Sequence, residues 1–131
     1  MSADRLAFKC VAATDAERTR YGEVPRYPEG LHELARDTYA WLVPNGSWGE
    51  SNSGLVVSGG EALLIDTLWD VAHTRRMLDA MSPFHDHRPI RQVVNTHSDG
   101  DHFWGNQLVD DAEIITSLAS QKEMSKHRPK T

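Results

Sequence analysis

The sequence has few of the features that place a chain in a membrane or in a disulfide-bonded scaffold. Its single cysteine, Cys10, excludes an internal disulfide. The longer apolar runs, Leu55–Val57 and Ala62–Ile65, are far short of the roughly 20 residues that a membrane-spanning helix needs. The first residues show no basic region followed by an apolar core, as a secretory signal would. We therefore expect a cytoplasmic protein with no membrane partner.

Positive charge is also scarce. There are 14 Lys and Arg residues against 19 Asp and Glu residues, which gives a formal net charge of -5. Nucleic-acid-binding domains usually carry a clustered basic patch, and no such cluster is visible, so we expect no nucleic-acid partner. With 131 residues, 39% apolar and 25% charged, the chain is long enough for one hydrophobic core and short for two domains.

The chain divides into two regions of different character. Residues 1–29 have weak periodicity and are interpreted as an extended N-terminal arm, with a short strand at 5–11. From residue 30 onward, apolar runs alternate with turn-forming residues. Strands are predicted at 31–35, 38–43, 55–58, 61–66, 90–95 and 113–116. Helices are predicted at 67–82, closed by Pro83, at 100–109 and at 118–126. This order indicates an α/β (α+β) fold, a mixed sheet with helices packed on it.

A dense group of metal-binding side chains follows the strand predicted at 90–95. Two histidines and two aspartates lie within six positions: His97, Asp99, Asp101 and His102. Residues two apart in an extended segment point the same way, and ligands of such sheets collect at the carboxyl ends of strands. The pattern therefore predicts a metal site. Helix capping, the alternative, explains one or two of the acids but not both histidines.

Gly100 lies between the two acids. We expect it to supply the unusual backbone angle that a reversal between two pairs of ligands needs.

This stretch resembles the signature of the metallo-β-lactamase superfamily, which reads His-x-His-x-Asp-His after a strand. Here it reads His97-Ser98-Asp99-Gly100-Asp101-His102. The resemblance extends to four further motifs: Asn52-Ser53-Gly54, Leu63-Leu64-Ile65-Asp66-Thr67, Asn95-Thr96 and Gly105-Asn106. It implies that residues 30–131 form a partial metallo-β-lactamase-like domain, the N-terminal half of an αββα sandwich with helices on one face of its sheet.

The resemblance also implies a role for each matching residue of the signature. His97 would bind the first metal ion, and Asp101 and His102 would bind the second. Asp101 would in addition orient the water molecule that attacks the substrate.

Three further residues would act around the metal loop. Asp66, together with Thr96, would support the loop by hydrogen bonds from outside the ligand set. An N-cap on the following helix is the alternative for Asp66. Trp48 lies in a Gly-rich loop that overhangs the metals in the family, where it would contact the substrate or pack against the protein.

The sequence departs from the family pattern at two points. One affects which metal ion is bound, and the other affects whether the metal site is complete. Asp99 replaces the family's second histidine, and its harder oxygen ligand makes iron or manganese an option beside zinc, the default at one or two ions. The family's downstream ligands have no counterpart before Thr131, and His127 lies in a basic, proline-flanked stretch. A second polypeptide, a second copy or a truncated gene would account for the missing half.

Three functions follow as hypotheses. The first is a hydrolase module in which metal-activated water attacks an ester, thioester, lactone, lactam or similar bond of a small-molecule substrate. The second is a non-catalytic or regulatory half-fold that needs a partner chain. The third is a di-iron redox protein, which only the carboxylate of Asp99 favours.

Overall fold

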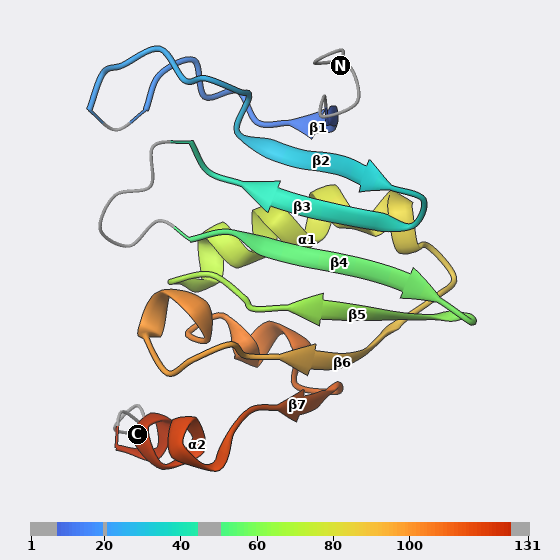
Figure 1. The fold of residues 1–131 in the computed structure, drawn as a ribbon, viewed down its shortest axis with the longest axis vertical. Helices are drawn as coiled ribbons and strands as arrows, with labels where there is room; N and C mark the ends of the chain where they lie inside the picture. The colour runs from blue at the N-terminus through green and yellow to red at the C-terminus, as the bar shows by residue number, and fades with distance from the viewer. Residues whose placement is uncertain (1–7, 20, 45–50, 127–131) are drawn as a thin grey trace, which may run out of the picture.

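The computed structural model describes residues 8–19, 21–44 and 51–126, which form a mixed seven-stranded sheet with helices (Figure 1). The strands lie side by side in chain order. Their bounds are β1 Lys9–Ala13, β2 Gly30–Ala35, β3 Thr38–Leu42, β4 Ser53–Ser58, β5 Glu61–Ile65, β6 Ile90–Val94 and β7 Glu113–Ile115. Strands β1 to β5 pair antiparallel, whereas β5, β6 and β7 pair parallel. The predicted α/β class and mixed sheet are confirmed.

Helix α1, Val71–His85, connects the parallel strands β5 and β6 and lies behind the sheet in the view of Figure 1. Its side chains Met77 and Met81 are fully buried and belong to the same core as Leu55, Leu64 and Val93 of the sheet. These sheet residues alternate with half-buried neighbours, as expected for a strand with one covered face. No helix in the described ranges has the length and apolar character needed to cross a membrane.

Helix α1 begins and ends later than predicted. The prediction of 67–82 is wrong at the start because the backbone of Asp70 is extended, with φ -148° and ψ 174°, so no helix runs through it from residue 67. The side chain of Asp70 caps the first turn instead. Pro83 lies inside the helix rather than closing it.

The helix predicted at 100–109 is two short 3₁₀ helices, η2 Gly100–His102 and η3 Asn106–Val109. Between them Gly105 lies against α1: a Cβ built on it would be 2.0 Å from Oγ1 of Thr74. The N–H of Gly105 donates to the carbonyl oxygen of Leu68, which fixes this close approach. Helix α2, Leu118–Ser125, is present nearly as predicted.

The strand within the N-terminal arm lies at Lys9–Ala13, and it pairs with β2 at one edge of the sheet. This part of residues 1–29 therefore extends the sheet. The domain boundary at residue 30 remains a prediction.

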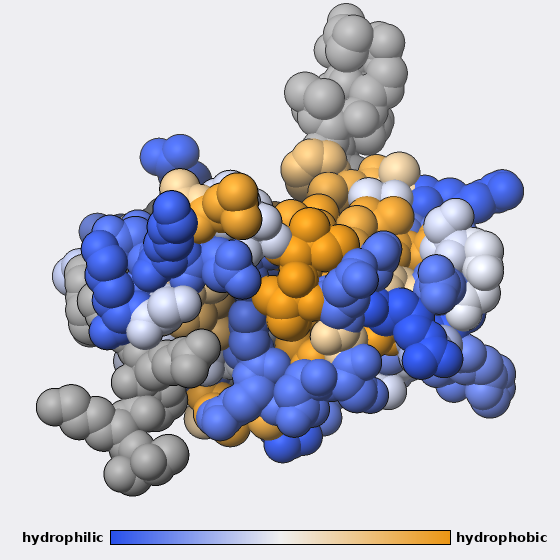
Figure 2. Space-filling model, turned by 90° about the horizontal axis from the view of Figure 1, so that it is seen from below, coloured by the Kyte–Doolittle hydropathy of each residue, from blue (hydrophilic) through white to orange (hydrophobic). Residues whose placement is uncertain are grey.

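On the second face of the sheet, no helix of the described residues lies over β3 to β5 (Figure 1). On this face Val56 pairs with Leu63, and Ile65 pairs with Val94, all of them half-buried. Figure 2 shows the molecule from the β7 side, where apolar residues gather across the middle. Ile115 of β7, which pairs with Val94, is 38% exposed.

Candidate functional site

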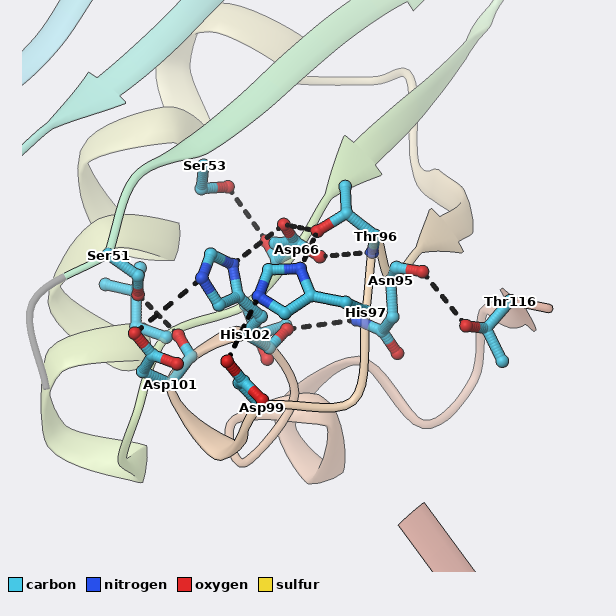
Figure 3. A network of polar contacts seen from close by, with 12 residues as sticks. Ser51, Ser53, Asp66, Asn95, Thr96, His97, Asp99, Asp101, His102 and Thr116 are labelled. Carbon is cyan, nitrogen blue, oxygen red and sulfur yellow. Dashed lines mark hydrogen bonds and ion pairs between the residues drawn. The ribbon is translucent and has the colours of Figure 1, made fainter. Parts of the chain in front are cut away.

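The predicted site residues meet at the carboxyl ends of two adjacent parallel strands (Figure 3). Asp66 directly follows β5, and Thr96 lies just beyond β6. The parallel register places these two strand ends side by side because Ile65 pairs with Val94. The strand order thus brings together residues that are 30 positions apart in the sequence.

Asp66 is buried at the centre of this group. Its side chain is 6% exposed, and its backbone has a φ of +64°, an uncommon angle for a residue other than glycine. Its carboxylate accepts hydrogen bonds from the backbone N–H of Thr96 at 2.8 Å and from Oγ1 of Thr96 at 2.7 Å. Nδ1 of His102 lies 2.9 Å from Oδ2 of Asp66. The alternative in which Asp66 caps a helix is wrong, since Asp70 is the N-cap of α1.

These hydrogen bonds define the tautomers of both histidines. An ionised carboxylate only accepts, so His102 must donate from Nδ1 to Asp66. The hydroxyl of Thr96 already donates to Asp66, so its oxygen must accept from Nδ1 of His97, which lies 2.8 Å away. In neutral histidines this network leaves the lone pair of Nε2 free on both rings.

The free Nε2 atoms face the other two carboxylates of the signature. Nε2 of His97 lies 3.7 Å from Oδ2 of Asp99, and Nε2 of His102 lies 3.6 Å from Oδ2 of Asp101. The two rings are neighbours, with centroids 4.0 Å apart. In Figure 3, Asp66 lies on one side of the rings and the two other aspartates lie on the opposite side. Lone pairs of nitrogen and oxygen that face one another repel unless a metal ion, a proton or a bridging water molecule lies between them.

The four signature side chains are of types that bind metal ions, but they do not form a closed ligand shell. Imidazole nitrogens and carboxylate oxygens are ligands of zinc, iron and manganese. As placed, no group of three or more His, Cys, Asp or Glu side chains within the described ranges could hold an ion. The four side chains form two pairs, and Asp99, whose side chain is 78% exposed, is the most accessible of them.

The backbone of the loop that carries the four candidate ligands is held by polar side chains to which the sequence assigned no role. Nδ2 of Asn95 donates to the carbonyl oxygen of His102 at 3.1 Å, and Nδ2 of Asn106 donates to Oδ1 of Asn95 at 2.7 Å. Oγ1 of Thr67 donates to Oδ1 of Asn106, and Oγ of Ser51 donates to the carbonyl oxygen of Asp101. Both asparagines lie in motifs that resemble the family, which was the only signal for them in the sequence.

The expected role of Gly100 is wrong. Its φ is not positive, so no unusual backbone angle requires a glycine there. Instead the indole ring of Trp104 lies against it, and a Cβ on Gly100 would be 2.3 Å from that ring. Trp48, the predicted substrate contact, lies outside the described residues.

Comparison with known proteins identifies the family. The model of the metallo-beta-lactamase superfamily matches residues 46–131. No curated protein matches the chain. Among solved structures, a metallo-beta-lactamase from Pontibacter korlensis is 20% identical with a TM-score of 0.65, covering 77% of this chain and 49% of that one. One from Hirschia baltica is 21% identical with a TM-score of 0.59, covering 76% of this chain and 48% of that one.

A third similar structure is the metallo-beta-lactamase FIM-1 from Pseudomonas aeruginosa in its mono-zinc form. It is 21% identical with a TM-score of 0.58, covering 76% of this chain and 48% of that one. The fold and the family match together show that the chain belongs to the metallo-beta-lactamase superfamily. The chain spans about half the length of these structures, as expected of a partial domain.

Proposed function

We propose that the chain is the N-terminal half of a metal-dependent hydrolase module. One observation carries the proposal: two histidines with free Nε2 lone pairs face two carboxylates at distances below 4 Å. A metal ion bound between them would interact favourably with these lone pairs. The metal ligands would be His97, Asp99, Asp101 and His102.

Each residue of the site has a part in the proposed reaction. A bound metal ion would lower the pKa of a water ligand to about 7 and polarise the bond under attack. Asp101, the catalytic residue, would accept a hydrogen bond from the attacking water and so orient it. Asp66 and Thr96 hold the two histidine rings in the tautomer that binds metal. The substrate would be a small molecule with an ester, thioester, lactone, lactam or similar bond, which Trp48 would contact.

The ligand types are compatible with more than one metal ion. Zinc is the expected metal, at one or two ions, because it binds mixed nitrogen and oxygen ligands and is the metal of the mono-zinc relative. Asp99 adds a second hard oxygen ligand, which suits iron or manganese as well.

The chain would need a partner to complete the site. The ligand pairs are open, and the second face of the sheet is apolar. A second polypeptide or a second copy of the chain would cover this face. These same observations favour the second candidate, a non-catalytic half-fold that acts only through its partner. A cytoplasmic location is proposed for either case.

Elemental analysis of the purified full chain tests the proposal. We expect stoichiometric zinc, or iron or manganese, in the unmodified chain, and loss of most of it in His97→Ala and Asp101→Ala. His87→Ala is the matched control, because His87 is 96% exposed and pairs only with Asp86 among the described residues.

The same preparations separate the candidate functions. Zinc together with hydrolysis of a panel of esters, thioesters, lactones and lactams would support the hydrolase, and two irons would support the redox alternative. If no preparation contains a transition metal, with or without a complementing second half, the hydrolase proposal fails.

A further inference from the structure

A pocket of about 170 Å³ lies beside the candidate metal site. Its walls come from the start of α1, from β3, from the segment after β5 and from the N-terminal arm. Ser51 contributes to one wall and also holds the carbonyl oxygen of Asp101. The four proposed metal ligands are not among its lining residues. The pocket is therefore a neighbour of the metal site and not a part of it.

One wall of the pocket is apolar and aromatic. Trp41, Leu68 and Trp69 line it, and the first two are 3% exposed. The ring of His73 packs on Trp69 with centroids 4.9 Å apart, which steadies that wall. An apolar cavity of about 150 Å³ is large enough to bind benzene. The pocket can therefore take one phenyl ring or a branched aliphatic group.

Two opposite charges also line the pocket. Arg76 projects from α1 and is exposed, and Glu29 lies in the arm and is partly buried. Neither side chain makes a hydrogen bond or ion pair with a residue in the described part of the chain. A guanidinium group binds a carboxylate with two parallel hydrogen bonds, and a carboxylate binds an ammonium group. Within the described residues the pocket thus offers a guanidinium group, a carboxylate and a partly apolar wall.

We propose that this pocket binds a free amino acid with an aromatic or branched aliphatic side chain. The side chain would lie between Trp41 and Trp69, the carboxylate would bind Arg76, and the ammonium group would bind Glu29. A free amino acid fits because it carries both charges on one carbon next to a compact apolar group. The proposal needs no metal ion and is independent of the hydrolase.

Isothermal titration calorimetry of the full chain with three probes tests whether both charged groups of the ligand contribute to binding. L-Phenylalanine has both charges, phenylacetate lacks the ammonium group, and phenethylamine lacks the carboxylate. Since a hydrogen bond to a charged group is strong, we expect each analogue to bind about tenfold or more weakly than L-phenylalanine. An absence of phenylalanine binding, or equal affinities for the three probes, would overturn the proposal.

Substitutions locate the bound amino acid. Arg76→Gln and Glu29→Gln should each weaken phenylalanine binding about tenfold or more. Arg75→Gln is the matched control, because Arg75 is the exposed neighbour on the same helix and does not line the pocket. An equal loss in Arg75→Gln would contradict the assignment. His97→Ala should retain full affinity, and a loss there would place the ligand at the metal site instead.

Discussion

At the scale of single residues, Asp66 links the two histidines of the site. One of its carboxylate oxygens is close to both His102 and the hydroxyl of Thr96, which in turn is close to His97. Its left-handed backbone angle costs on the order of 1 kcal/mol for a residue other than glycine. The three hydrogen bonds to the carboxylate offset that cost. The conformation of this one residue therefore sets the orientation of both rings.

The effect of Asp66 on the tautomers can be measured without any metal. In the metal-free chain we expect His97 and His102 to carry their proton on Nδ1. In Asp66→Asn the amide NH₂ group can only donate, so the Nε2–H form of His102 should increase. Long-range proton–nitrogen correlation spectra of the histidine rings report both forms.

The control for this experiment is Asp70→Asn, which changes an aspartate beside a different histidine, His73. It should leave the spectrum of His102 as it is in the unmodified chain. An Nε2–H tautomer of His102 in the unmodified chain would contradict the network described above.

Much of the candidate site could be predicted from the sequence, because its main residues are close together in the chain. The spacing of His97, Asp99, Asp101 and His102 predicted that all four face one metal site, whereas the structure places them as two pairs and, within the described residues, as no group of three. The contact between Ser51 and Asp101 could not be predicted, since it joins residues 50 positions apart. Such contacts depend on the tertiary fold and leave no local periodicity.

At the scale of secondary structure, strands were easier to predict than helix limits. Alternation and turn residues defined β2 to β7 to within about two residues, because strand limits depend on local turns. The start of α1 depends instead on the extended backbone of Asp70, which a continuous helix from residue 67 could not contain. Asp70 then begins the helix, with its side chain 2.6 Å from the N–H of His73.

Loss of this cap should destabilise α1. Burial raises the pKa of Asp70, but hydrogen bonds from the backbone and side chain of His73 and the positive charge of Arg76 outweigh it, so the pKa is below its usual range. We expect Asp70→Ala to lower the free energy of unfolding by about 1 kcal/mol at neutral pH. Urea denaturation followed by circular dichroism measures the difference.

The effect of Asp70 should depend on pH in a definite direction. Because its pKa is lower in the folded state, the carboxylate stabilises the fold fully above the unfolded pKa of about 3.9. This stabilisation is lost as the pH falls through the folded pKa. The difference between the unmodified chain and Asp70→Ala should therefore shrink in acid. Asp70→Ser, a cap without charge, should be close to the unmodified chain in stability at neutral pH and should lack this dependence. A difference that grows in acid would contradict the assignment.

At the scale of the whole molecule, the sheet has one covered and one open face. Helix α1 covers the face that contains Leu55 and Leu64, whereas Val56 and Leu63 lie on the other face. The sequence predicted this layered arrangement, because predicted hairpins are followed by predicted strands and helices in alternation. The occupant of the open face could not be predicted, because the chain spans about half of its structural relatives. An apolar sheet face of this kind favours association.

Self-association through the open face gives the last prediction. Burying one leucine side chain contributes about 1.5 to 3 kcal/mol, so a lysine at its position should weaken association about tenfold or more. We expect Leu63→Lys to remain monomeric at concentrations where the unmodified chain forms larger species in sedimentation velocity. Glu61→Lys, on the same strand and exposed, is the matched control and should associate as the unmodified chain does. A chain that is monomeric at every concentration, with no change in Leu63→Lys, would show that a second copy does not cover this face and would leave a different polypeptide as its partner.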